Sequence, residues 1–178
     1  MLQANEFLDP AREMGFDWYA GVPCSFLTPF INYVICDSGL TYVGAANEGD
    51  AVSAAAGAVI GGHRGVAMMQ NSGLGNAVSP LTSLAYVFRI PLLVISTHRG
   101  APGLKDEPQH ELMGQITGEL FDTMAIPWEF FPDKATEVQP VLERAIDYFT
   151  REQRPYALLM QKGTVAPHAL ENQVTRPR

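Results

Sequence analysis

The chain has 178 residues, a formal net charge of -7 and a hydrophobic fraction of 47%. This length predicts one globular domain with a proper core, and the negative charge argues against nucleic acid as the main partner. No stretch reaches the roughly 18 unbroken apolar residues of a membrane span, and the first residues lack the pattern of a signal peptide. Two cysteines form no disulfide framework. We therefore expect a protein of the reducing cytoplasm that has neither nucleic acid nor a membrane as its partner.

Short apolar runs alternate with amphipathic segments along the chain. The apolar runs predict strands over 16–21, 40–45, 66–70, 91–97, 128–131 and 156–161. The other segments predict helices over 5–15, 25–37, 47–62, 77–88, 115–124 and 135–151, with Ser25 as the cap of the second. This order predicts an α/β fold, a doubly wound parallel sheet of about six strands with helices on both faces. Residues 1–165 are expected to form this domain, and residues 166–178 an irregular C-terminal arm.

The segment over 47–62 combines a helix of small side chains with two carboxylates at its start, Glu48 and Asp50. Carboxylates are favoured in a first helical turn because the unpaired amides there carry partial positive charge, and this explanation requires no function. Ligands in open α/β sheets, however, bind at the carboxyl ends of the strands, and this helix follows a predicted strand. One of the two carboxylates can therefore be a working acid, and the segment by itself leaves both interpretations open.

Three loops are expected to meet at the carboxyl edge of the sheet, over 22–25, 70–76 and 98–114. The second loop is rich in glycine but has neither the Walker pattern nor the dinucleotide fingerprint. It can equally be a ligand loop or a capped turn between a strand and a helix. The sequence contains no spaced set of metal ligands and no G-x-S-x-G elbow, so no metal site is predicted in this chain.

The loop over 98–114 is long for a compact domain, and loops of that length are often functional. Its densest polar cluster, K-D-E-P-Q-H, ends at His110. Histidine is the side chain best suited to move a proton near neutral pH, although a loop histidine can also be merely solvated. His98, at the end of the preceding strand, is a further candidate. Cys24 lies at a turn without a paired base, which favours a plain thiol over a nucleophile.

Five segments of the chain occur in a recognisable order. They read G-V-P-C-S-F-L, N-E-G-D-A-V-S-A-A-A-G, M-Q-N-S-G-L-G-N-A-V-S-P-L-T-S-L, I-P-L-L-V-I-S and H-R-G-A-P-G-L-K-D-E-P-Q-H-E-L-M-G. Over about residues 21–114 this pattern resembles the thiamine diphosphate-dependent decarboxylases of phosphonopyruvate and sulfopyruvate. The resemblance implies the pyrimidine-binding domain of that family, with thiamine diphosphate as the cofactor.

The resemblance also implies roles for individual residues. Glu48 would hydrogen-bond a ring nitrogen of the aminopyrimidine and favour the imino tautomer that takes the thiazolium proton, whereas Asp50 keeps its role at the helix start. His110 and Gln109 would bind the substrate or protonate the carbanion left after decarboxylation. The residues implied to contact the cofactor, besides Glu48, are Pro23, Asn71, Ser72, Gly73 and Asn76. Those implied to contact the substrate are Cys24, Ser25, Arg99 and Lys105, of which the two cations are candidates for its anionic group or are simply surface residues.

The chain lacks the G-D-G motif and the downstream Asn that hold Mg²⁺ and the diphosphate in this family. We therefore expect a beta subunit that carries the diphosphate-binding domain with its Mg²⁺, a hetero-oligomer with the active site at the interface, and no activity of this chain alone. The expected function is that of the alpha subunit of a 3-phosphonopyruvate decarboxylase, which forms phosphonoacetaldehyde and carbon dioxide. A sulfopyruvate decarboxylase alpha subunit stays open, because Cys24 resembles those enzymes whereas D-E-P-Q-H resembles the phosphonopyruvate type. A non-catalytic binding or regulatory module of the same fold is the alternative from another class.

Overall fold

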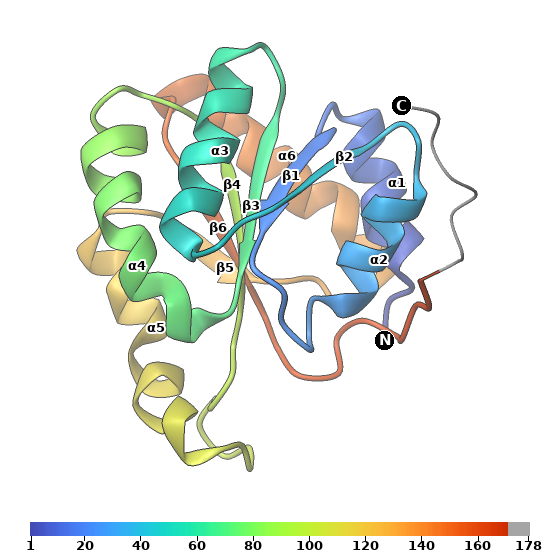
Figure 1. Ribbon diagram of the computed structural model, residues 1–178, viewed down its shortest axis with the longest axis vertical. Helices are drawn as coiled ribbons and strands as arrows, with labels where there is room; N and C mark the ends of the chain where they lie inside the picture. The colour runs from blue at the N-terminus through green and yellow to red at the C-terminus, as the bar shows by residue number, and fades with distance from the viewer. Residues whose placement is uncertain (171–178) are drawn as a thin grey trace.

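The computed structural model describes residues 1–170. Six parallel strands form one sheet in the order β2-β1-β3-β4-β6-β5 (Figure 1). These strands are β1 (Trp18–Gly21), β2 (Thr41–Gly44), β3 (Gly65–Met69), β4 (Leu93–Thr97), β5 (Trp128–Phe130) and β6 (Tyr156–Met160). Each strand predicted from an apolar run is confirmed, and so is the parallel sheet.

Helices cover both faces of the sheet (Figure 1). One face is covered by α1 (Ala4–Glu13), α2 (Thr28–Cys36) and α6 (Ala135–Glu152). The other is covered by α3 (Glu48–Ile60), α4 (Leu74–Ser79), the π-helical segment η2 (Pro80–Tyr86) and α5 (Glu111–Thr123). Two short 3-10 turns, η1 (Asn71–Gly73) and η3 (Pro108–His110), directly precede α4 and α5. The predicted doubly wound α/β fold is therefore confirmed.

The central strands are buried on both faces because their side chains alternate between two cores. In β3, Val66 and Met68 pack with α1 and α2, whereas Ala67 and Met69 pack with α3 and α4. All five residues of β3 are buried. A strand covered on both sides favours apolar residues at nearly every position, which explains why the sequence shows an unbroken apolar run here.

The order of the strands reverses between β1 and β3. Because β1 lies between β2 and β3, the chain leaves β1 in one direction and later returns to its other side. Ligands in open α/β sheets bind outside the carboxyl ends of the strands at such a reversal. The segments that follow the two strands meet there, since Cys24 Sγ donates to Gln70 Oε1 at 3.4 Å. The fold thus creates a candidate binding edge before any family is considered.

Three local predictions are wrong. Ser25 does not cap α2, because the amide of Thr28 donates to the carbonyl of Cys24 at 2.9 Å and the helix begins three residues after Ser25. The helix predicted from residue 77 already begins at Leu74, where the polar segment before it packs against α3. The helix predicted from residue 115 begins at Glu111, so the irregular loop is shorter than expected.

The boundary predicted after residue 165 stays a prediction. Leu2 and Val165 form an isolated parallel bridge, which ties the two ends of the predicted domain together. Of the predicted arm, residues 166–170 are irregular, and residues 171–178 lie outside the described residues.

Candidate active site

The two carboxylates at the start of α3 have different surroundings. Asn47 caps the helix, because its Oδ1 accepts from the amide of Asp50 at 3.1 Å, and its Nδ2 donates to Asp50 Oδ2 at 2.7 Å. Asp50 therefore serves the helix start, as expected. Glu48 does not take part in this cap, and its carboxyl turns toward the start of α4.

The carboxyl of Glu48 rests on two residues of the η1–α4 segment. Its Oε2 accepts from Asn76 Nδ2 at 2.9 Å. A Cβ added to Gly73 would overlap Glu48 Cδ and Oε1, so the absence of a side chain at Gly73 makes room for the carboxyl. A Cβ on Gly49 would lie 2.8 Å from the carbonyl oxygen of Asn76. The starts of α3 and α4 thus approach each other at backbone distance, which small residues alone permit.

Asn71 lies in the interior rather than at the binding edge. Its side chain is fully buried, and its Nδ2 donates to the carbonyl of Arg99 at 2.9 Å and to Thr117 Oγ1 at 3.0 Å. Its Oδ1 accepts from the amide of Arg99 at 3.1 Å. The expectation that this side chain faces the cofactor or substrate is therefore corrected, since its amide is used to join β3, β4 and α5.

A chain of polar contacts links the carboxyl ends of β1 and β3. Cys24 is buried, and its Sγ donates to Gln70 Oε1 and lies 4.0 Å from Thr97 Oγ1. Gln70 Nε2 in turn donates to the exposed Ser72 Oγ at 2.5 Å. Sequence analysis did not single out Gln70, although a polar residue directly after an apolar strand was the signal for it. Pro23 is exposed beside Cys24.

Arg99 is held by Asp106 in a two-pronged ion pair. Arg99 Nε donates to Asp106 Oδ2 at 2.7 Å, and Arg99 Nη2 contacts Asp106 Oδ1. Hydrogen bonds from Arg99 hold the pKa of Asp106 well below its usual range, and the same pairing raises the pKa of Arg99. The guanidinium also lies over the ring of Phe26, 4.8 Å from its centroid, and Nη1 donates to Ser25 Oγ at 3.3 Å. Lys105, in the same loop, is exposed.

The two candidate histidines of this loop are buried. His110 is 5% exposed, and its Nδ1 has no hydrogen-bond partner among residues 1–170. His98 Nε2 lies 2.7 Å from the carbonyl of Gly114, and because a carbonyl can only accept, Nε2 carries the proton. Gln109 is exposed. His98 Nδ1 is likewise without a partner among residues 1–170, so each histidine has a free Nδ1, and they differ in that Nε2 of His98 is bonded to α5.

Two glycines close the base of this loop. A Cβ on Gly114 would overlap the carbonyl of Gly100, and a Cβ on Gly100 would overlap the carbonyl of His110. Gly100 also has a positive φ of 71°, which favours glycine. Figure 1 shows the segment between β4 and α5 extending from one end of the domain. His110 is therefore presented on a loop whose two ends are fixed to each other.

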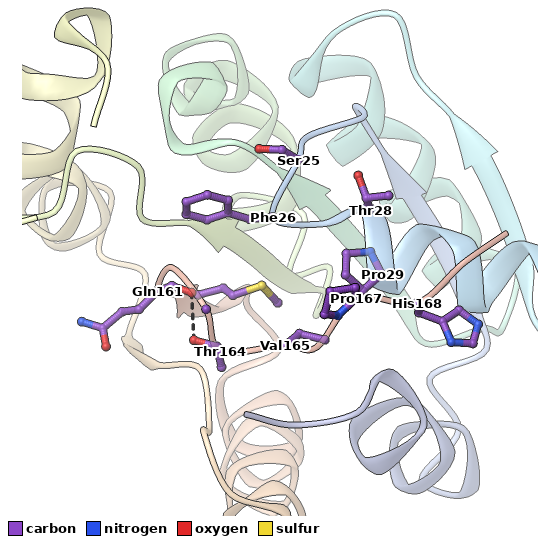
Figure 2. Close-up of a pocket in the computed structure, with 11 residues that line it drawn as sticks. Ser25, Phe26, Thr28, Pro29, Gln161, Thr164, Val165, Pro167 and His168 are labelled. Atoms are coloured by element: carbon purple, nitrogen blue, oxygen red, sulfur yellow. Dashed lines mark hydrogen bonds between the residues drawn. The ribbon is translucent and has the colours of Figure 1, made fainter. Parts of the chain in front are cut away.

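Several cavities lie along the carboxyl edge of the sheet. One of about 340 Å³ lies between the start of α2 and the segment after β6, where Phe26 and Pro29 face Thr164 and Val165 (Figure 2). Another of about 540 Å³ lies within the loop from Gly100 onward. A third, of about 370 Å³, lies between the start of α3 and η2 and is lined by Asp50 and Ser53 rather than by Glu48. The candidate edge is thus an open surface rather than one closed pocket.

No group of three or more His, Cys, Asp or Glu side chains within residues 1–170 could hold a metal ion. None of the helices in that range is long and apolar enough to cross a membrane.

The fold and the site define an open α/β domain with a glycine-packed carboxylate at its ligand edge. The model of the thiamine pyrophosphate enzyme N-terminal TPP binding domain matches residues 4–126, which is more than half of the chain. The chain therefore belongs to this family, and the resemblance read from the sequence is confirmed.

Two groups of decarboxylases are similar to this chain, one over its whole length and one over 83% of it. Phosphonopyruvate decarboxylases from Streptomyces hygroscopicus and Streptomyces viridochromogenes are 43% and 44% identical over 178 residues. This chain spans 44% of the length of each. The sulfopyruvate decarboxylase subunit alpha of Methanococcus maripaludis is 33% identical over 149 residues, which are 83% of this chain and 87% of that subunit. Sequence identity is higher to the phosphonopyruvate decarboxylases, whereas the match covers a larger share of the sulfopyruvate decarboxylase subunit.

A solved structure shares the fold. Benzoylformate decarboxylase from Polynucleobacter necessarius superposes with a TM-score of 0.70 at 20% identity, over 97% of this chain and 33% of that one. At this identity the similarity concerns the fold alone.

The site fits the aminopyrimidine end of thiamine diphosphate, the cofactor that gives the family its name. Glu48 is half-buried, and no donor among residues 1–170 reaches its Oε1. Gly73 provides a cradle that a Cβ would fill. The Glu48 carboxyl itself occupies this cradle, and a carboxyl held in place beside a helix start is suited to hydrogen-bond the edge of a flat ring.

Proposed function

We propose that this chain is the pyrimidine-binding alpha subunit of a split thiamine diphosphate-dependent 2-oxo acid decarboxylase. The proposed reaction converts 3-phosphonopyruvate to phosphonoacetaldehyde and carbon dioxide. The observation that carries the proposal is the position of Glu48, which is held by Asn76 and Gly73 at the carboxyl edge of the sheet. The identity of 43% and 44% to two phosphonopyruvate decarboxylases supports the choice of substrate.

Glu48 is the proposed proton-handling group. Its Oε1 has no donor among the described residues and so can exchange a proton with a ring nitrogen, while Oε2 stays bonded to Asn76. When bound, the cofactor supplies an electron sink for the carbanion left by decarboxylation. Pro23 and Ser72 are exposed near the same edge, as contacts to the cofactor require.

His110 is the proposed proton donor to the substrate carbon. Its free Nδ1 is buried, and a histidine can deliver a proton near neutral pH. A buried site also limits competing proton exchange with water. Gln109 is exposed next to it and is proposed to bind the carboxylate or keto group of the substrate.

Arg99 is proposed to bind the anionic end of the substrate. A guanidinium has five N–H donors, of which Asp106 takes two and Ser25 one. The remaining two can bind oxygens of a phosphonate or sulfonate. Lys105 adds an exposed positive charge in the same loop, and the buried Cys24 of the segment after β1 is also proposed to contact the substrate.

A beta subunit is proposed to supply the diphosphate-binding domain and Mg²⁺, with the active site at the interface. The relatives that match this chain in length are named subunit alpha, which implies an enzyme of more than one subunit in their case. The complex is proposed to act in the cytoplasm.

Sulfopyruvate is the second candidate substrate. The identity of 33% to the Methanococcus maripaludis subunit alpha supports it, and so does the resemblance at Cys24. The proposal is tested by co-expressing this chain with the product of the neighbouring reading frame and measuring carbon dioxide release with thiamine diphosphate and Mg²⁺. Faster turnover of phosphonopyruvate supports the first candidate, and faster turnover of sulfopyruvate the second. Release from neither acid would support a non-catalytic module.

A further inference from the structure

We propose that Asn76 is a positioning residue that reserves Oε2 of Glu48 and thereby directs the exchangeable proton of that carboxyl to Oε1. This inference rests on the proposed function, because it assigns the working oxygen of the proposed acid. It also changes the role expected for Asn76 from a cofactor contact to a group that acts through Glu48.

The direction of the Asn76–Glu48 hydrogen bond determines which oxygen of the carboxyl accepts. Asn76 Nδ2 lies 2.9 Å from Glu48 Oε2. An amide nitrogen can only donate, so Oε2 must accept. In a protonated carboxyl the carbonyl oxygen accepts better than the hydroxyl oxygen. The bond therefore favours the form in which Oε2 is the carbonyl oxygen and the proton resides on Oε1.

The two oxygens of the carboxyl lie in different surroundings. Glu48 Cδ and Oε1 lie against Gly73, at the place where a Cβ would otherwise sit. The carbonyl of Asn76 packs against Gly49, where a Cβ would lie 2.8 Å from that oxygen. Asn76 lies at the start of α4 and Glu48 at the start of α3, and these two helix starts are in backbone contact. The Asn76–Glu48 pair therefore keeps one arrangement.

A positioning role and a purely structural role predict different measurements. Asn76 is exposed and Glu48 is only half-buried, and hydrogen bonds between accessible groups contribute little to stability. Loss of the Asn76 amide should therefore leave the melting temperature nearly unchanged. It should nevertheless slow proton transfer, because small misplacements of a catalytic group reduce rates strongly.

Asn76→Asp is the informative variant, because it keeps the size of the side chain and removes the donor. In the reconstituted complex with thiamine diphosphate and Mg²⁺, we expect the exchange rate of the cofactor C2 proton to fall by roughly tenfold to a hundredfold. The alkaline limb of the pH–rate profile, where Glu48 loses its proton, should move to higher pH, because two carboxylates in contact resist being charged together. Asn76→Ala should slow the exchange without moving this limb as far. A crystal structure of the Asn76→Ala chain without cofactor should show Glu48 displaced from Gly73.

Asn47→Ala is the matched control. Asn47 is also an amide at the start of α3, but it bonds Asp50 and not Glu48, so its loss should lower the melting temperature and leave the exchange rate unchanged. The inference is overturned if Glu48→Gln abolishes exchange whereas Asn76→Asp does not slow it, and the proposed function then still stands. It is also overturned if the Asn76 variants behave like Asn47→Ala, with a lower melting temperature and an unchanged exchange rate. Unchanged exchange in Glu48→Gln would overturn the proposed function together with this inference.

Discussion

The side chain of Asn71 bonds both backbone groups of Arg99, accepting from its amide at 3.1 Å and donating to its carbonyl at 2.9 Å. A residue on a neighbouring strand would satisfy Arg99 in the same way. Asn71 follows β3 within two residues and Arg99 follows β4 within two, so the side chain prolongs the β3–β4 pairing beyond the strands. The loop that carries Asp106 and His110 starts from this bridge.

Asn71→Ala should destabilise the fold. It leaves the amide and carbonyl of Arg99 without their partner in a buried place, and each unsatisfied group costs about 1–3 kcal/mol. We expect the free energy of unfolding in urea to fall by about 2–4 kcal/mol. Ser72→Ala, an exposed neighbour, should change it by less than about 0.5 kcal/mol. Equal stability of the wild type and Asn71→Ala would show that the bridge contributes little.

Gly73→Ala should displace Glu48 without unfolding the chain. Gly73 has φ -87° and ψ -5°, which alanine adopts readily, so the backbone is not strained. The new methyl group overlaps the Glu48 carboxyl instead. We expect the affinity of the complex for thiamine diphosphate, measured by calorimetry, to fall at least about tenfold, which corresponds to 1.4 kcal/mol.

Gly75→Ala is the control for that substitution. Gly75 lies in α4 with no atom within 4 Å of an added Cβ, and alanine favours a helix by up to about 1 kcal/mol over glycine. This variant should be as stable as the wild type or more so, with cofactor affinity unchanged. Equal cofactor affinity in Gly73→Ala and Gly75→Ala would contradict the role of Gly73 in placing the Glu48 carboxyl.

The Arg99–Asp106 pair should make stability depend on acid pH. The pairing depresses the pKa of Asp106 in the folded state, so its contribution is complete above the unfolded value of about 3.9 and declines as the pH falls below it. Asp106→Asn should therefore be less stable than the wild type at pH 7, and the difference should shrink below about pH 4. Urea unfolding across this range measures it. Glu107→Gln, an exposed neighbour, controls for net charge, and a pH-independent difference for Asp106→Asn would argue against the pairing.

His110→Ala should reduce turnover and leave cofactor binding intact. Loss of a positioned acid–base group typically costs roughly 10²–10⁴-fold in rate. Because His110 is buried, alanine also leaves a space, so His110→Asn serves as a variant closer in shape. Both should lower kcat in the reconstituted complex at unchanged affinity for thiamine diphosphate. Normal kcat in His110→Asn would make His110 a bystander.

The sheet could be predicted from the sequence because a strand buried on both faces consists mainly of apolar residues. The run over 91–97 is the clearest example, and all five residues of β4 are buried. The start of α4 could not be predicted in this way. Its polar, glycine-rich residues resemble a turn, and only their packing against α3 makes them helical.

A candidate site residue could be proposed from the sequence where its own position pointed to it. A residue whose role depends on a partner side chain could not. Glu48 could be singled out by its place after a strand and by the family resemblance. The role of Asp106 depends on a guanidinium seven residues away, which no local pattern specifies. Asn71 was expected at the ligand edge because a polar residue after a strand looks the same whether its side chain points outward or, as here, into the core.

The central claim is that Glu48 activates the cofactor in a two-chain decarboxylase. Its most direct test is carbon dioxide release from 3-phosphonopyruvate by the reconstituted complex, with the wild-type chain and with Glu48→Gln at equal melting temperature. We expect turnover in the wild type and loss of most of it in the variant, because glutamine keeps the shape of the side chain and cannot exchange the proton. Wild-type turnover in Glu48→Gln would contradict it.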